Sequence, residues 1–544
     1  MRNRPPTPIR FTPVGASDTL DQTQVFKGAM SSLQNLIPDP TTENLWVPRP
    51  AALAVADFVA AGFTSPGIIT CTYVVGTRIY GMVASTAVGG KDRPFCFDTA
   101  GNSFVTITGA TNNNTPTSPA ATGAWTPPHI DLIGVYLIVA HPGFPSTDGK
   151  FFGVINISNP AAVTYDSGQT ATNALPCAPS WVSQFSGRAY YFCNPTTGQP
   201  AALASDALDP LTRTNAGYVL TFDDNIPITA AAGLPLENQL GGIIQSLLVF
   251  KSTTNIYQVT GDFASTTSPI SRNTLNVSTG TLAPNSIVVT TKGIAFMAPD
   301  GYRFIDFTAQ VSDPIGFAGK GITLPFSASV VPSRVAAACN SSVVRVSTQN
   351  GAAPNSPNQE WAYDIVRGIW SGPHTLPASL ICNVDNTFFT MPIGYPALIY
   401  KSEFTPNSTS TYTENGTPLS WVFQTSLMPD TGEMAQNAMS ETTANIGYPA
   451  GATIINVTAL NQDQQVLAFA SLNPSLPSSS WGGFSWGGAV WGGAVKAMAP
   501  RVIPWPIPVE FARVSVMIQG TSANGIRLGD LALKYQVLNY LPTV

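Results

Sequence analysis

The stretch IVVTTKGIAFMAPDGYRFID, from Ile287 to Asp306, gives the clearest indication of fold in this chain. Two short apolar runs, 294–298 and 302–306, flank the residues Pro-Asp-Gly at 299–301. Proline presets φ for a turn, aspartate bonds the backbone near it, and glycine accepts positive φ. The flanking β-branched and aromatic residues suit a pleated, half-buried surface. The stretch therefore predicts a β-hairpin.

Similar units recur on both sides of this stretch. Ser246 to Thr260 repeats the order of apolar run, polar turn and apolar run, and the runs 181–185 and 188–193 pair in the same way across Ser186 and Gly187. About six or seven such units lie between residues 65 and 405, at irregular spacing, so no strict repeat exists. A ring of small antiparallel sheets accommodates this many units and protects their edges. A β-propeller is therefore expected, with a pair of β-sandwiches as the main rival.

The chain changes character after about residue 410. Several runs there alternate apolar and polar residues, which predicts a separate antiparallel β-sandwich-like domain. Within this part lies WGGFSWGGAVWGGA, from Trp481 to Ala494, in which tryptophan recurs every five residues. The expected fold is all-β, with an extended N-terminal arm at 1–60, a β-propeller-like domain at 61–410 and a C-terminal β domain at 411–544.

The arm is expected to be extended because prolines at 5, 6, 8 and 13 disfavour helix. Within it, Phe26 to Ile37 is compatible with a short helix or a docking strand. Ala201 to Leu208, farther along the chain, is compatible with a brief helix.

The amino-acid composition narrows the range of functions that this chain could have. Charged residues make up only 10% of the 544 residues, and Lys+Arg 25 against Asp+Glu 30 give a net charge of -5. Proteins that grip nucleic acid gather cations to neutralise phosphate, and the only basic cluster here is Arg2, Arg4 and Arg10. DNA would slide past such a surface rather than adhere to it. No secretory signal or membrane-spanning segment is recognisable, which predicts synthesis in a cytoplasm.

No metal or cofactor site is expected. The six cysteines include no C-x-x-C pair, and only three histidines are present, so a zinc site is not predicted. Most cysteines sit in apolar runs and are expected to be free, buried thiols rather than disulfides.

No catalytic signature emerges, and the chain is not expected to be an enzyme. The three histidines, His129, His141 and His374, all lie beside prolines and read as loop-edge residues. The carboxylates considered as a glycosidase pair fit turns or solvated loops better: Asp223, Asp224, Asp300, Asp306 and Asp364. Lys91, Asp92 and Arg93 read as a solvated turn.

The tryptophans are the best candidates for contact residues. Three interpretations of the Trp-Gly-Gly run stay open: a loop that buries its own indoles, a contact between subunits, and a platform for a sugar. The assembly or packing candidates are Trp46, Trp481, Trp486, Trp491 and Trp505.

Several stretches together resemble the tail hub or nozzle proteins of short-tailed bacteriophages, including the packaged-DNA-stabilisation type. They are NLIP at 35–38 through WVPRP at 46–50, AGFTSPG at 61–67, Leu247 to Asp262, Lys292 to Asp306, Trp361 to Trp370 and the Trp-Gly-Gly run. The resemblance implies a structural virion protein whose propeller-bearing subunits form a six-fold ring that extends the portal and adaptor channel. Such a ring would retain packaged double-stranded DNA, conduct it on ejection, and carry tail fibres or a needle outside. The arm would tie neighbouring subunits.

Two other functions stay open. A secreted or surface propeller could bind or cleave glycans, for which it needs an aromatic platform beside carboxylates. A tail-fibre module would form trimers rather than a larger ring.

Overall fold

The computed structural model describes residues 7–540 apart from 17–28, 88, 111–114, 119–125, 145–150, 169–172, 223, 238–242, 276–277, 316–330, 350–357, 376–377, 393–397, 407–409, 415, 429–434, 448–453, 473–498 and 523–524. The described part is built of strands, with two 3-10 turns, η2 (Pro284–Ser286) and η4 (Pro332–Arg334), and no α-helix. Two segments that were compatible with helices contain strands instead: β3 (Ala29–Gln34) with β4 (Leu36–Pro38), and β18 (Ala201–Ala204).

The hairpin expected at 287–306 is present. Strand β25 (Gly293–Ala298) pairs antiparallel with β26 (Gly301–Ile305), and Ala298 opposite Gly301 leaves a two-residue turn. Asp300 in that turn pairs with Arg303. Gly293 is a position that needs glycine: its φ is 125°, and a Cβ there would lie 2.0 Å from the carbonyl oxygen of Ile305.

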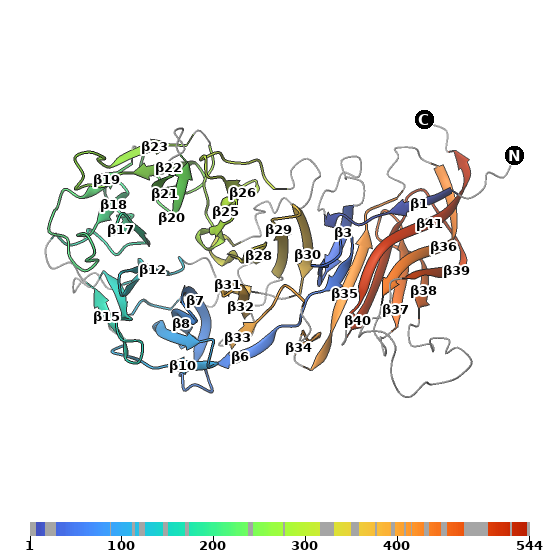
Figure 1. The fold of residues 1–544 in the computed structure, drawn as a ribbon, viewed down its shortest axis with the longest axis horizontal. Helices are drawn as coiled ribbons and strands as arrows, with labels where there is room; N and C mark the ends of the chain where they lie inside the picture. Colours follow the sequence, from blue (N-terminus) through green and yellow to red (C-terminus); the bar gives the residue numbers. More distant parts are fainter. Residues whose placement is uncertain are drawn as a thin grey trace.

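Seven of the nine sheets among the described residues follow one another along the chain and form a ring, the propeller (Figure 1). Blade 1 contains β7 (Pro66–Val75), β8 (Arg78–Ser85), β9 (Arg93–Asp98) and β10 (Ser103–Val105); blade 2 contains β12 (His129–Ile133), β13 (Tyr136–Ala140), β14 (Phe152–Asn156), β15 (Val163–Gly168) and β11 (Ile107–Thr108). Blade 3 contains β16 (Trp181–Phe185), β17 (Arg188–Cys193), β18 and β19 (Val219–Thr221); blade 4 contains β20 (Ala230–Glu237), β21 (Ile243–Lys251), β22 (Asn255–Thr260) and β23 (Ser271–Thr274). Blade 5 contains β24 (Val288–Thr290), β25 and β26; blade 6 contains β27 (Ala336–Cys339), β28 (Val343–Gln349), β29 (Asn358–Asp364) and β30 (Ile369–His374); blade 7 contains β31 (Ala378–Val384), β32 (Thr387–Pro392), β33 (Leu398–Lys401) and β6 (Leu53–Asp57).

Apolar cores fill the spaces between neighbouring blades. Phe97 and Phe389 share the core between blades 1 and 7, and Phe152 and Tyr191 stack between blades 2 and 3. The ring is closed by β6, which precedes blade 1 in sequence but pairs antiparallel with β33 of the last blade. The propeller is therefore sealed by hydrogen bonds between segments more than 300 residues apart.

The other two sheets form the antiparallel β-sandwich at the end of the molecule away from the ring (Figure 1). One sheet contains β39 (Ala499–Phe511), β36 (Ala435–Gly447), β41 (Arg527–Tyr540), β5 (Trp46–Pro48), β4 and β1 (Thr7–Phe11). The other contains β2 (Gly15–Ala16), β3, β35 (Thr417–Thr425), β40 (Ser515–Ser522), β37 (Ile455–Leu460), β38 (Val466–Leu472) and β34 (Thr413–Glu414). The expected all-β fold, a propeller plus a C-terminal sandwich, is confirmed.

The N-terminal segment is extended, but its described strands pair within this chain. β1 pairs with β41 and β3 with β35, and β6 belongs to blade 7. Residues 7–57 are thus shared between the two domains.

The two domains meet at the outer strand of blade 6. One apolar cluster continues across the junction and includes Met297 and Trp370 of the propeller with Leu33 and Trp421 of the sandwich. At the same place Gly15 lies so close to blade 6 that a Cβ on it would approach Ile369 to 3.2 Å. A continuous buried core of this kind holds the two domains as one body.

Candidate functional site

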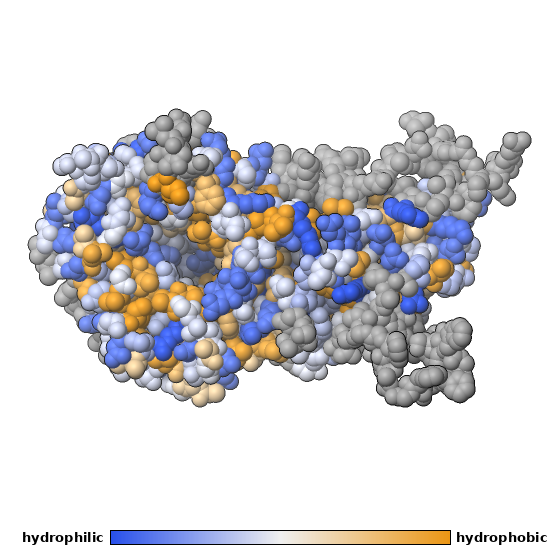
Figure 2. Space-filling model, viewed as in Figure 1, coloured by the Kyte–Doolittle hydropathy of each residue, from blue (hydrophilic) through white to orange (hydrophobic). Residues whose placement is uncertain are grey.

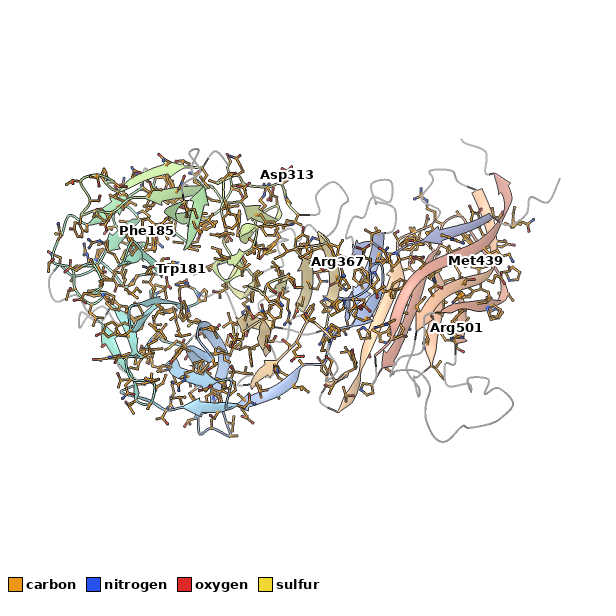
Figure 3. All side chains as sticks on the ribbon, in the orientation of Figure 1. Trp181, Phe185, Asp313, Arg367, Met439 and Arg501 are labelled. Atoms are coloured by element: carbon orange, nitrogen blue, oxygen red, sulfur yellow. The ribbon has the colours of Figure 1, made fainter. Side chains whose placement is uncertain are left out.

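The inner strands of the propeller surround an axial hollow. It has a volume of about 340 Å³ and is lined by residues of all seven blades, among them Tyr73, His129, Asp131, Trp181 and Ser183. Figure 2 shows the face of the ring hollowed at its middle, and in Figure 3 Trp181 lies nearer that middle than Phe185. This size is typical of a site for a small molecule.

Asp131 is the acidic group among the described residues that line the hollow. Its carboxylate accepts hydrogen bonds from the backbone N–H groups of Gln184, at 2.7 Å, and of Leu132, at 2.8 Å. Burial raises the pKa of Asp131, and hydrogen bonds from Tyr73 and Ser183 oppose that effect. The carboxylate is thus already engaged by groups that stabilise its charged form.

His129 and Trp181 stack beside this carboxylate. Their ring centroids are 3.4 Å apart with an angle of 18° between the planes, and the Trp181 indole donates to the carbonyl of Ala231 at 3.0 Å. Burial lowers the pKa of His129 to about 3, so its imidazole is neutral near pH 7. His129 begins strand β12 rather than sitting in a loop edge as the sequence suggested.

The chemistry of the hollow fits binding better than hydrolysis. A glycosidase of the common kind needs two carboxyl groups on either side of the bond that breaks, and the described lining supplies Asp131 alone. The buried neutral imidazole of His129 is also held against an indole rather than beside a nucleophile.

His374 and Ser371, at the junction of the domains, are near each other but are not a catalytic pair. The backbone N–H of Asn35 donates to His374 Nδ1 at 3.1 Å, so Nδ1 carries no proton and Nε2 does. Nε2–H then points to the Ser371 hydroxyl, 3.3 Å away, and cannot accept its proton. Burial, reinforced by the charges of Arg49 and Arg345, lowers the pKa of His374 well below its usual value. His374 is 3% exposed, so it is a core residue rather than a loop-edge one.

Asn35 is the centre of a buried polar network that joins the domains. Its side-chain amide donates to the Thr375 hydroxyl and to the carbonyl of Ser420, both at 2.7 Å. Its side-chain oxygen accepts from the backbone N–H of Thr375 and from Arg49 Nε, both at 3.0 Å. Arg49 in turn pairs with Glu414 at 2.7 Å. Sequence reasoning missed this network, since only the buried positions of these polar residues reveal it.

A second buried ion pair lies nearby, inside blade 6. Arg345 and Glu360 are both inaccessible to solvent and are 2.6 Å apart. Arg345 also donates to the Ser402 hydroxyl at 2.7 Å and lies over the rings of Phe388 and Phe404. Burial raises the pKa of Glu360, while Arg345 and Arg49 hold it down. The charged side chains at the junction therefore interact with one another.

The carboxylates weighed as a catalytic pair do not converge among the described residues. Asp224 pairs with Lys251, Asp300 pairs with Arg303, and Asp306 and Asp364 accept backbone N–H groups of their own turns. Asp223 lies outside the described residues.

The burial of Asp92 differs from the prediction made from the sequence. Its neighbours made it look like part of a solvated turn, but it is 1% exposed, and Thr70 donates to it at 3.1 Å. Burial raises the pKa of Asp92 to about 6.

The tryptophan candidates separate into two groups. Trp46 and Trp505 are buried inside this chain, and Trp505 donates to the Thr442 hydroxyl at 3.0 Å. Trp481, Trp486 and Trp491 lie outside the described residues.

The described residues contain no group of three or more His, Cys, Asp or Glu side chains arranged to hold a metal ion. The six cysteines are all described and are free thiols. Within the same ranges no helix is long and apolar enough to cross a bilayer.

Comparison with known proteins adds only distant likenesses. No family model matches the sequence, and no curated protein does. Among solved structures, Raptor from Chaetomium thermophilum is similar with a TM-score of 0.39 and 10% identity; the match covers 66% of this chain but only 29% of Raptor. The WD40 domain of SCAP from fission yeast has a TM-score of 0.28 at 9% identity, with 87% of this chain and 98% of that one covered. The GH32 β-fructofuranosidase BmSUC1 of Bombyx mori has a TM-score of 0.26 at 8% identity, with 91% and 95% covered. These similarities concern the fold and carry no information on activity.

Proposed function

We propose that this chain is a structural subunit, without catalytic activity, of a ring that encloses double-stranded DNA in a bacteriophage tail. The observation that carries the proposal is the joining of propeller and sandwich by a continuous core and a buried polar network. Two domains joined in this way form one rigid body, which a subunit under mechanical load requires.

The positions of the cationic side chains support a channel that lets DNA pass rather than a surface that binds nucleic acid tightly. The chain has few cations, and a share of them is removed from the surface: Arg49, Arg188, Arg213, Arg334 and Arg345 are all buried. Because affinity for DNA grows with the number of phosphates neutralised, this surface favours passage of a duplex over its retention by direct contact.

The DNA would pass between copies of the chain and not through the propeller. The axial hollow, at about 340 Å³, has the size of a small-molecule pocket. A duplex presents a major groove alone about 12 Å wide. A wider channel therefore has to be formed by several subunits around a common axis.

The edge of the sandwich offers a surface for such contacts. Exposed apolar side chains lie on two of its edge strands, one from each sheet: Val466 and Phe469 on β38, and Val502 and Ile507 on β39. β39 also carries prolines at 500, 504, 506 and 508, which have no N–H to offer to a further strand. A neighbour would therefore pack on the side chains rather than extend the sheet.

Native mass spectrometry and negative-stain electron microscopy of the purified chain test the proposal. We expect a closed ring of more than three copies. The double variant Val502→Lys with Ile507→Lys should weaken it, because burial of each apolar side chain contributes about 1.5–3 kcal/mol. The matched control is Val366→Lys, an exposed valine on the propeller, which should leave the ring intact. A monomer at every concentration, or a trimer, would contradict the proposal.

A second candidate function is glycan binding by the propeller, and the axial hollow favours it. Trp181 and Asp131 put an aromatic ring and a carboxylate at one small cavity. Saturable binding on a glycan array, lost in Asp131→Asn, would support it. A hydrolase panel would separate binding from cleavage.

A further inference from the structure

We propose that Cys177 and Cys193 form a reversible oxidation site, at which a hydroperoxide converts the two free thiols into a disulfide. The site lies where the linker from blade 2 enters blade 3, and it is independent of the proposed ring.

The two thiols are neighbours in the fold. Cys193 is the last residue of β17, and its Sγ donates to the carbonyl oxygen of Cys177 at 3.5 Å. The linker is held beside the strand because the backbone N–H of Ser180 donates to the carbonyl of Phe192 at 2.9 Å. The backbone thus already brings the two side chains together.

The two cysteines differ in the way that an attacking and a resolving thiol differ. Cys177 is half-buried and open to a small oxidant, whereas Cys193 is fully buried. The hydrogen bond from Cys193 lowers the pKa of Cys177 to about 7, and the same contact together with burial raises that of Cys193. A large part of Cys177 is therefore thiolate at neutral pH, which is the reactive form.

The buried guanidinium of Arg213 also interacts with this site. Arg213 is 3% exposed; its Nη1 donates to the carbonyl of Asn173 at 2.7 Å and its Nε to that of Ala204 at 3.3 Å. Asn173 donates back to the carbonyl of Arg213 at 3.0 Å. Arg213 fixes the start of the linker, and its charge favours a thiolate at Cys193.

The chemistry balances with hydrogen peroxide, the simplest hydroperoxide, as the only oxidant. The Cys177 thiolate attacks one peroxide oxygen, the O–O bond breaks, and hydroxide leaves and takes up a proton to become water. The sulfenic acid formed on Cys177 is then attacked by the Cys193 sulfur. The S–O bond breaks, the S–S bond forms, and the thiol proton leaves with the oxygen as a second water. Two sulfur atoms are oxidised and one peroxide is reduced.

The remaining cysteines provide an internal comparison. Cys339 is also half-buried, but its thiol donates to the carbonyl of Asn340 at 2.8 Å, and burial raises its pKa to about 11. Because of this higher pKa, a far smaller fraction of Cys339 than of Cys177 is thiolate at pH 7, although its thiolate is a somewhat stronger nucleophile. Cys339 should therefore react with iodoacetamide at pH 7 on the order of a hundredfold more slowly than Cys177.

Intact-mass and peptide mass spectrometry of the full chain, before and after hydrogen peroxide, test the proposal. We expect a loss of the mass of two hydrogen atoms, a peptide containing Cys177 linked to one containing Cys193, and reversal by dithiothreitol. Cys177→Ser should abolish the mass loss, and Cys339→Ser should not change it. The oxidised chain should also melt at a higher temperature, because a cross-link restricts the unfolded state.

An unchanged mass after peroxide, or a linkage between other cysteines, would overturn the proposal. So would equal alkylation rates at Cys177 and Cys339, a measurement on the native chain that does not depend on any variant folding.

Discussion

Replacing Asn35 by alanine should strongly destabilise the chain at the junction of the domains. The side chain makes four hydrogen bonds, to Thr375 twice, to Ser420 and to Arg49, and none of it is exposed. Three bonds between neutral groups contribute about 1 kcal/mol each and the bond to the guanidinium about 1.5 kcal/mol. The loss of these hydrogen bonds is therefore expected to lower the free energy of unfolding by about 4.5 kcal/mol.

The backbone adds a further loss, which can be measured separately. Asn35 has a φ of 55°, which alanine adopts with difficulty. Asn44 has a φ of 60° and is exposed, and it has none of the four bonds. Asn44→Ala is therefore a matched control, and it should lose only the backbone contribution of about 1 kcal/mol.

Urea denaturation, followed by tryptophan fluorescence and by far-ultraviolet circular dichroism, measures both variants. Trp421 and Trp370 lie in the core that spans the junction, so fluorescence reports on that region directly. Asn35→Ala within 1 kcal/mol of the wild type, or no larger in effect than Asn44→Ala, would refute the reasoning that this network holds the domains together.

Three further predictions concern the blades. Gly293→Ala should unfold blade 5 or cost upwards of about 3 kcal/mol, because its Cβ would lie 2.0 Å from the carbonyl oxygen of Ile305; thermal unfolding measures this. Asp92→Asn should stabilise the chain by up to about 3 kcal/mol at pH 7.5, because the folded pKa of about 6 exceeds the unfolded value, and the gain should fade as the pH falls towards 4. His129 and His374 have folded pKa values below the unfolded one, so stability should fall as the pH drops through 6.5, and His129, whose folded pKa is about 3, should account for about 2 kcal/mol of that loss at pH 5.

Each of these has its own control. Gly134 also has a positive φ, but nothing lies within 4 Å of a Cβ placed there, so Gly134→Ala should be mild, and equal effects at the two glycines would contradict the steric argument. A stability gain in Asp92→Asn that is the same at pH 4 and pH 7.5 would mean that ionisation is not its source. His129→Gln should flatten the dependence on pH between 7 and 5, and a slope equal to that of the wild type would count against a buried neutral imidazole.

Local patterns in the sequence predict the blades well. The turn at 299–301 and the pairing of 181–185 with 188–193 both follow from residues close in sequence, and both are present. The all-β class follows in the same way, because alternation and turn residues act locally. The number of blades depends instead on how many hairpins close a ring, which no single hairpin encodes.

The sequence did not predict which distant strands pair or which polar side chains are buried. The strand at Leu53–Asp57 has an ordinary apolar pattern, and nothing near it indicates a partner at Leu398–Lys401. Asp92 and Asn35 carry polar side chains that usually lie at the surface, and only the fold shows that they are buried. The axial hollow, likewise, exists only after seven inner strands have met.

The pairing of the first strands with the last has a consequence for how the chain is made. A ribosome releases residues 7–57 before residues 398–540, so β6 must wait for residues 398–401, and β1 and β3 must wait for residues 417–540. Contacts so distant in sequence make folding slow and leave strand edges uncovered meanwhile. Strands β1 and β6 therefore stay without these partners until residues 398–540 have been made, and chaperones that bind extended apolar segments would meet the nascent protein at this stage.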